Sequence, residues 1–242
     1  MRYGIFSDVH SNLEALDAVL DAYENEHIDA YLCVGDIVGY AANPNECIEK
    51  VRALAEVTVA GNHDWASVGL FSEDYFNPYA KEAIYWTRGN LYATSKQFLE
   101  SLQLVYENQD LTLVHGTLDG AGNFDYMIDE FVARDSFRIL HTDICFVGHL
   151  HTTGVFAKDK SGGIVYGEPN QLQLKEGDQY IVNVGSVGQP RDGNPDAAYC
   201  IYDTEKKEVR IKRVRYDTEA ARTKIIKAGI PVKLGDRLLE GR

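Results

Sequence analysis

The chain opens with Arg2-Tyr3-Gly4-Ile5-Phe6-Ser7-Asp8-Val9-His10, an apolar stretch that ends in a carboxylate and an imidazole. The short apolar run Arg2–Phe6 predicts a β-strand. The next segment, Ser11–Glu26, places its large apolar side chains on one stripe, which predicts an amphipathic helix packed on a sheet. A strand that leads into a helix is the repeating unit of α/β folds.

The same unit recurs before residue 65. Ala30–Val34 and Val57–Ala60 are two further apolar strands, each followed by a glycine. Between them, Asn43 and Pro44 provide a cap and a first helical residue for a helix that runs to about Leu54. This alternation implies parallel pairing of the strands and a layered α/β fold.

Residues 64–103 interrupt that pattern. The segment is predicted to be helical and carries many aromatic side chains, which either form a small core of their own or cover the carboxyl edge of the sheet as a lid. We expect a single domain over residues 1–242 with this helical insertion. The aromatic residues of the insertion are Trp65, Phe71, Tyr75, Phe76, Tyr79, Tyr85, Trp86, Tyr92 and Phe98.

The second half is dense in predicted strands, so we expect a second sheet packed against the first. A closing helix near 217–228 precedes what is predicted to be a polar tail. The strands and hairpins are expected at Leu111–Val114, Ile144–Val147, Thr153–Gly167, Tyr180–Val184, Tyr199–Asp203 and Glu208–Tyr216.

Composition narrows the class of protein. The chain has 242 residues, 45% of them hydrophobic and 25% charged, which is the composition of a folded globular protein. No stretch approaches the ~20 apolar residues of a membrane span, and no apolar signal core precedes Asp8. The four cysteines form no close pair, so we expect reduced thiols and a cytoplasmic location. A net charge of −13 argues against a protein that binds nucleic acid through phosphate contacts.

Polar side chains follow five of the predicted strands at the point where each strand ends. Because the carboxyl ends of parallel strands meet at one edge of a sheet, we expect these side chains to share one crevice. Each motif alone is typical of a turn or a helix cap, but burying all of them together requires hydrogen bonds or coordination. The motifs are Asp8-Val9-His10, Gly35-Asp36-Ile37-Val38-Gly39, Gly61-Asn62-His63-Asp64, Val114-His115-Gly116 and Gly148-His149-Leu150-His151.

This set of side chains predicts a metal site. Nitrogen and oxygen ligands without thiolate favour Mn, Fe, Zn, Co or Ni, and histidines argue against calcium or magnesium alone. Seven candidate ligands are too many for one ion, so two ions that share a carboxylate fit better.

The five blocks, in this order, resemble the calcineurin-like metallophosphoesterases, and the region after them is similar to the small prokaryotic phosphodiesterase branch. The resemblance implies a four-layer α/β/β/α sandwich of two mixed sheets and a dinuclear centre of transition-metal ions, with manganese preferred. It places Asp8, His10 and His151 on the first metal, places Asn62, His115 and His149 on the second, and makes Asp36 the bridge.

His63 is not a ligand in this pattern. The resemblance implies that it contacts the substrate phosphate or protonates the leaving oxygen, and the alternative is that it only orients Asp36. The activity implied is hydrolysis of a small phosphodiester or a nucleotide phosphoanhydride by a hydroxide that bridges the metals, with Asn62 also contacting the substrate. The alternatives are a phosphomonoesterase, or a binding scaffold that has lost catalysis.

Other residues carry weaker signals. Arg191 is a candidate for gripping a phosphate, against a salt bridge with Asp192. Asn12 fits a helix cap better than a substrate contact, and Arg88 fits a solvated side chain. The block after Gly39 lacks the arginine of the protein phosphatases and diadenosine tetraphosphatases, which weakens those assignments. We expect a small phosphate ester as the partner, and exposed aromatics of the insertion are compatible with a homodimer.

Overall fold

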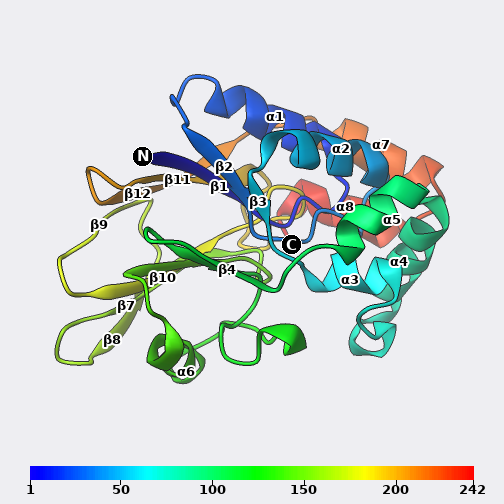
Figure 1. Cartoon of the computed structure of the whole chain (residues 1–242). Helices are drawn as coiled ribbons and strands as arrows, with labels where there is room; N and C mark the ends of the chain where they lie inside the picture. The colour runs from blue at the N-terminus through cyan, green and yellow to red at the C-terminus, as the bar shows by residue number, and fades with distance from the viewer.

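The computed structural model describes residues 1–242 as two mixed six-stranded sheets packed face to face (Figure 1). The first sheet has the strand order β3-β2-β1-β11-β12-β9 and the second has the order β4-β5-β6-β10-β7-β8. The strands are β1 (Arg2–Phe6), β2 (Ala30–Cys33), β3 (Val57–Thr58), β4 (Val105–Glu107), β5 (Thr112–Val114), β6 (Ile144–Val147), β7 (Thr153–Lys158), β8 (Ile164–Gly167), β9 (Gln171–Gln173), β10 (Gln179–Val184), β11 (Ala197–Asp203) and β12 (Glu208–Val214).

Helices cover the outer faces of both sheets. Figure 1 shows α1 and α2 above one sheet and α6 below the other. The helices are α1 (Leu13–Tyr23), α2 (Pro44–Leu54), α3 (Asn62–Val68), α4 (Pro78–Asn90), α5 (Ala93–Glu100), α6 (Glu130–Ile139), α7 (Thr218–Lys227) and α8 (Val232–Glu240), with 3-10 turns at Glu73–Tyr75 and Ala121–Asn123.

Three apolar clusters separate these layers. The two sheets bury Ile5, Leu32 and Phe146 between them, together with their neighbours. The helical layer over the first sheet packs through a cluster that includes Leu16, and the one over the second sheet packs through a cluster that includes Phe137. The predicted four-layer α/β/β/α sandwich is therefore confirmed.

The parallel pairing predicted for the first strands is also confirmed. β1 pairs in parallel with β2, and β2 pairs in parallel with β3. β5 and β6 are parallel as well, but they belong to the second sheet. The five strand ends therefore come from two sheets rather than from one open sheet, and the crevice lies where the two carboxyl edges meet.

The predicted helix over Ser11–Glu26 is shorter in the structure, because it begins only after Asn12. The Asn12 side chain accepts a hydrogen bond from the backbone N–H of Ala15 at 3.2 Å and donates one to the carbonyl oxygen of Gly188 at 2.8 Å. The expectation of a helix cap at Asn12 is confirmed, and the same side chain ties the cap to a distant loop.

The insertion is helical as predicted, but it has no separate core. Ala80 and Ala83 of α4 pack with α7 and α8, and Leu99 of α5 joins the cluster of the first helical layer. The alternative of an independent small core is therefore wrong.

The prediction of a polar tail after residue 228 is wrong. α8 occupies Val232–Glu240 and buries Leu234 and Leu238 in the cluster that also holds Tyr40. Only two leucines one turn apart mark this buried face, which is too short a pattern to recognise in a polar sequence. α6 was not foreseen for a related reason, since small Ala133 and Ser136 make up much of its buried face.

Candidate metal centre

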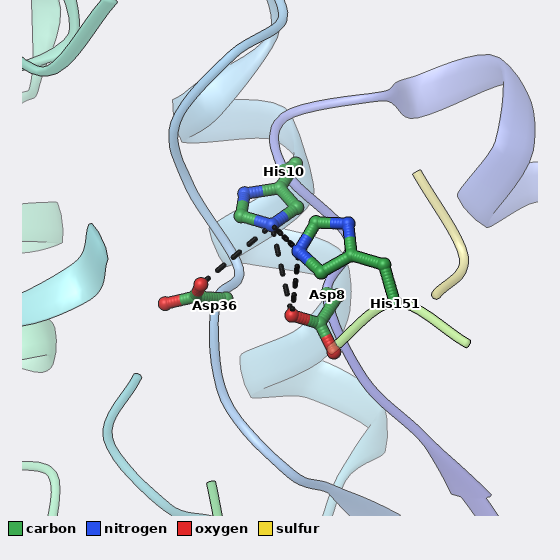
Figure 2. Close-up of side chains that lie close together, drawn as sticks. All are labelled: Asp8, His10, Asp36 and His151. Carbon is green, nitrogen blue, oxygen red and sulfur yellow. Dashed lines mark hydrogen bonds and ion pairs between the residues drawn. The ribbon is translucent and has the colours of Figure 1, made fainter. Parts of the chain in front are cut away.

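The loops at the carboxyl ends of the strands bring the predicted ligands together. Potential donor atoms of Asp8, His10, Asp36 and His151 lie within 4.8 Å of one another, and Figure 2 shows this group. A second group with the same spacing consists of Asp36, His115 and His149. Asp36 belongs to both groups, as expected for the bridging carboxylate that the resemblance implies.

Three of the imidazoles are anchored through Nδ1 and turn Nε2 toward this centre. Nδ1 of His10, His115 and His151 lies 3.0, 2.7 and 2.6 Å from the carbonyl oxygens of Val38, Val34 and Gln189, respectively. A carbonyl only accepts, so each Nδ1 carries a hydrogen, and in the neutral ring Nε2 keeps its lone pair. This is the tautomer that binds a metal through Nε2 while the other nitrogen is anchored.

The atoms that face the centre repel one another unless a cation lies among them. Nε2 of His10 and Nε2 of His151 are 3.0 Å apart, and Oδ1 of Asp8 is 3.2 Å from the latter. Oδ2 of Asp36 lies 3.3 Å from Nε2 of His115. Lone pairs and carboxylate oxygens gather at these distances around a proton or a metal ion.

Several buried donor atoms have no hydrogen-bond partner. A buried polar atom without a partner costs about 1–3 kcal/mol, so such a concentration is typical of a site that binds a ligand. A divalent cation would satisfy all of these atoms together, and the residues therefore fit the group that the fold implies. The atoms are Oδ1 of Asp8, Oδ2 of Asp36, Oδ1 of Asn62, Nε2 of His115 and Nε2 of His149.

Two glycines make room for the carboxylates. A Cβ atom on Gly61 would lie 2.0 Å from Oδ1 of Asp36, and one on Gly148 would lie 2.5 Å from Oδ2 of Asp8. No side chain fits at these distances, so the glycines of the sequence motifs serve the close approach of the carboxylates.

The backbone itself is strained at the centre. Five of the seven candidate ligands adopt left-handed φ angles between +49° and +69°, a region that costs about 1–3 kcal/mol for residues other than glycine. The turn that each residue makes aims its side chain into the crevice rather than along the strand. These residues are Asp8, His10, Asp36, His149 and His151.

Electrostatics keeps the carboxylates ionised. Burial alone would raise the pKa of Asp8 and of Asp36, but the surrounding imidazoles hold both values well below their usual range. Burial lowers the pKa of His149 to about 3 and that of His151 to about 4, so both are neutral near pH 7. His115 is the exception, because Asp36 outweighs the effect of burial and raises its pKa to about 9.

His63 contacts the centre in two ways. Its backbone N–H donates to Oδ1 of Asp36 at 2.8 Å, so the main chain, not the ring, orients that carboxylate. Its buried imidazole packs 4.8 Å from the ring of His10 and 4.4 Å from that of Tyr40, and Nδ1 has no partner. Burial lowers the pKa of this ring well below its usual value. The imidazole is thus free to meet a ligand.

A cavity of about 420 Å³ opens over Asp36, Asn62, His63, His149 and His151. Its walls combine aromatic side chains with two arginines, so it offers both apolar contact and positive charge. Only three of the insertion's nine aromatic residues reach it. The aromatic and arginine residues of the wall are Tyr40, Phe71, Tyr75, Phe76, Phe124, Tyr126, Arg191 and Arg237, and Asn77, Asn123 and Asp125 complete it.

Arg191 faces this cavity and does not pair with its neighbour in sequence. Its guanidinium donates to Oε1 of Gln189 at 2.9 Å and to the hydroxyl of Tyr40 at 3.2 Å. Asp192 pairs with Arg213 instead. The alternative of an Arg191–Asp192 salt bridge is therefore wrong.

Arg88 lies away from the cavity and is not a free solvated side chain. It donates to the carbonyl oxygen of Ala66 at 2.6 Å and pairs with Glu73 at 3.5 Å. Sequence reasoning missed six cavity residues outside the insertion, namely Tyr40, Asn123, Phe124, Asp125, Tyr126 and Arg237. None of them belongs to a motif, and only the tertiary fold brings them to the site.

None of the helices is both long enough and apolar enough to cross a membrane. All four cysteines are buried and unpaired.

Comparison with known proteins agrees with this geometry. The chain is 41% identical over 242 residues to the uncharacterized protein MJ0912 of Methanocaldococcus jannaschii, and the alignment covers 98% of this chain and 97% of the relative. The crystal structure of a metallophosphoesterase from Sphaerobacter thermophilus is 41% identical and superposes with a TM-score of 0.89 over 100% of this chain and 99% of that one.

The hypothetical protein PH1004 of Pyrococcus horikoshii OT3 shares the fold, with 18% identity and a TM-score of 0.79 over 100% of this chain and 98% of that one. The sequence model of the calcineurin-like phosphoesterase superfamily domain matches residues 1–207. The chain therefore belongs to the calcineurin-like phosphoesterase superfamily, and it is a metal-dependent phosphoesterase.

Proposed function

We propose that the protein hydrolyses a small phosphodiester or a nucleotide phosphoanhydride at a centre of two divalent ions. The observation that carries this proposal is the place of Asp36, whose carboxylate is common to both groups of donor atoms. Asp36 would bridge the two ions. One ion would be held by Asp8, His10 and His151, and the other by Asn62, His115 and His149.

The donor set suits manganese best, and iron, zinc, nickel and cobalt are compatible with it, since the donors are nitrogen and oxygen without thiolate. When bound, two such ions neutralise the oxygens of a phosphate and lower the pKa of a water molecule towards ~7. Asn62 contributes an oxygen ligand without a negative charge, which spares the incoming phosphate a repulsive neighbour.

The chain's own residues prepare the substrate. Asn62 and Arg191 would each bind phosphate oxygens of the substrate, because both line the cavity and both have donor groups available. His63 would contact the substrate phosphate or protonate the departing oxygen, since its imidazole lines the cavity. Burial keeps the ring neutral, so proton donation requires that the negative charge of the bound phosphate raise the pKa of this imidazole.

We also propose that residues 1–242 form one domain, located in the cytoplasm, with a small phosphate ester as partner. A phosphomonoesterase is the second candidate activity, because Phe71, Tyr75 and Phe76 of the insertion wall the cavity on one side and restrict a second ester arm. A scaffold without catalysis is disfavoured, since every donor atom and His63 are in place.

The test is hydrolysis of bis-p-nitrophenyl phosphate by metal-stripped protein, with and without added Mn²⁺. The Asp36→Asn variant removes the shared carboxylate. Asp17→Asn is the matched control, because it makes the same chemical change at a half-exposed residue of α1 that pairs with Lys50 outside the site. We expect Mn²⁺-dependent turnover that Asp36→Asn abolishes and Asp17→Asn leaves intact. Turnover by Asp36→Asn at the wild-type rate would refute the shared site. Turnover of p-nitrophenyl phosphate alone would favour the monoesterase.

A further inference from the structure

Two arginines line the cavity over the metal centre, and one of them comes from a part of the chain outside the family pattern. Arg191 lies in the loop after β10, and Arg237 lies on α8. The superfamily match ends at residue 207, so no family motif assigns a role to Arg237.

Backbone contacts fix both arginines beside the metal centre. The N–H of Arg191 donates to the carbonyl oxygen of His151 at 3.0 Å, which joins its loop to a candidate ligand. The N–H of Gly193 donates to the carbonyl oxygen of Gly241 at 2.9 Å, which joins the same loop to the end of α8. Gly241 has a φ of +64°, and a Cβ atom there would lie 2.6 Å from the backbone of Asn194. The loop and the helix are thus held tightly together.

Neither arginine forms a salt bridge with a side-chain carboxylate. Arg191 is bound to Gln189 and Tyr40, and Nε of Arg237 donates to the main-chain oxygen of Arg242 at 2.6 Å. Acidic residues outnumber Lys and Arg by 37 to 24 in this chain, so two neighbouring arginines without such partners stand out. Burial and the charge of Arg191 also lower the pKa of Arg237.

A second cavity next to the one over the candidate metal ligands also carries basic side chains. Arg237 also lines a neighbouring cavity of about 640 Å³ between α4 and α8, together with Lys233 and Arg242. Two carboxylates line that cavity as well, but Asp236 pairs with Arg222 and Glu240 with Arg242. Arg237 therefore lies at the junction of two cavities, on the side where a substrate would extend beyond the phosphate held by the metals.

We propose that Arg191 and Arg237 form a second anion subsite, and that the substrate is a phosphoanhydride with two phosphate groups, such as a nucleoside diphosphate, rather than a diester with a single charge. This inference rests on the proposed function, because it assumes that the first phosphate binds at the metal centre. The charge of the site supports it. Two divalent ions and the two arginines would together carry a charge of +6, and the carboxylates of Asp8, Asp36 and Asp125 carry −3. The remaining charge of +3 is larger than the single negative charge of a phosphodiester can neutralise.

The experiment is calorimetric binding of AMP and of the non-hydrolysable α,β-methylene analogue of ADP to Mn²⁺-loaded protein. We expect the diphosphate analogue to bind about tenfold more tightly than AMP, the effect of one charge-assisted contact. Arg237→Ala should bring this ratio close to one, and Arg237→Lys, which keeps the charge but not the fork, should leave an intermediate ratio. Arg52→Ala is the control, because it removes one positive charge from an exposed position on α2.

Equal binding of the two nucleotides by the wild type, or an unchanged ratio in Arg237→Ala, would overturn the subsite. Thermal unfolding shows whether Arg237→Ala folds, and Arg237→Gln replaces it if α8 is destabilised. Hydrolysis of ADP and of bis-p-nitrophenyl phosphate is measured in parallel. Turnover without a preference for the diphosphate contradicts the subsite alone, whereas a preference without any turnover contradicts the proposed function alone.

Discussion

Replacing Gly61 with alanine should disable the metal centre through a single methyl group. The new Cβ would lie 2.0 Å from Oδ1 and 2.3 Å from the backbone nitrogen of Asp36, whereas ordinary contacts begin at 3.4 Å. Asp36 or its loop must therefore move by about 1.4 Å. Because one of the two contacts is to backbone, rotation of the Asp36 side chain cannot relieve the overlap.

A misplacement of about 1 Å costs roughly 100-fold in rate, and overpacking a buried site costs about 1–3 kcal/mol of stability. We expect Gly61→Ala to lose at least that factor in kcat/KM for bis-p-nitrophenyl phosphate and to bind less Mn²⁺. The assays are initial rates at saturating Mn²⁺, metal content after dialysis, and thermal unfolding.

Gly89→Ala is the matched control for this substitution. Gly89 is exposed in the last turn of α4, and nothing lies within 4 Å of a Cβ atom built there. Alanine at this position should leave activity unchanged and raise stability by about 0.5–1 kcal/mol, the usual gain in a helix. If Gly61→Ala retains its Mn²⁺ and its kcat/KM within a factor of three, the close approach to Asp36 does not position the carboxylate.

Three further outcomes are expected. His63→Gln should lower kcat by about 100-fold or more while leaving Mn²⁺ content unchanged, because only the backbone of His63 contacts Asp36; lost metal would contradict the assignment. Removing the metals with a chelator should lower the melting temperature by about 5–10 °C, the loss expected when metal ions present at 100 times their Kd no longer stabilise the folded state. An unchanged melting temperature would mean that metal binding adds nothing to the stability of the fold. Glu26→Gln should destabilise the protein by about 1 kcal/mol at pH 7, because Glu26 pairs with Lys212 and with Arg210 at 3.2 Å. These cations outweigh burial and depress the pKa of Glu26 in the folded state, so its contribution is complete above the ordinary value of 4.5 and disappears as the pH falls through the lowered one. Urea unfolding at pH 7 and pH 3 tests this, and a gap between wild type and variant that is as large at pH 3 as at pH 7 would contradict it.

The sequence allowed the three parallel strands of the first sheet and the candidate ligands to be predicted because both rest on local signals. The expectation that the second half of the chain builds only the second sheet was wrong, because β9, β11 and β12 extend the first one. Apolar strands that end in polar residues beside glycines can be recognised without a structure, and the structure gathers their side chains in one crevice. What each of them does there stays a prediction. The spacing of the five strands along the sequence did not reveal that they divide between two sheets. Parallel strands in both sheets bring their carboxyl ends to the same crevice, so the sequence pattern is the same in either case.

The remainder depends on contacts between distant segments. Arg237 reaches the cavity only because the end of α8 is hydrogen bonded to the loop of Gly193. Neither a hydrophobic periodicity nor a motif in residues 229–242 predicts that contact. The wall made by Phe124 and Tyr126 lies in a stretch with little regular structure, where neither helical nor strand periodicity can place a side chain.

The left-handed backbone at Asp8, His10, Asp36, His149 and His151 has a consequence for directed evolution. Glycine adopts such φ angles with less strain, so replacing any of these residues with glycine relieves about 1 kcal/mol and at the same time deletes a donor atom. A library selected for heat resistance in the presence of a chelator, where no metal ion adds stability, would therefore accumulate inactive clones at these five positions. Selection for thermostability in this protein has to be coupled to turnover from the first round, because these strain-relieving mutations lie on the candidate metal ligands.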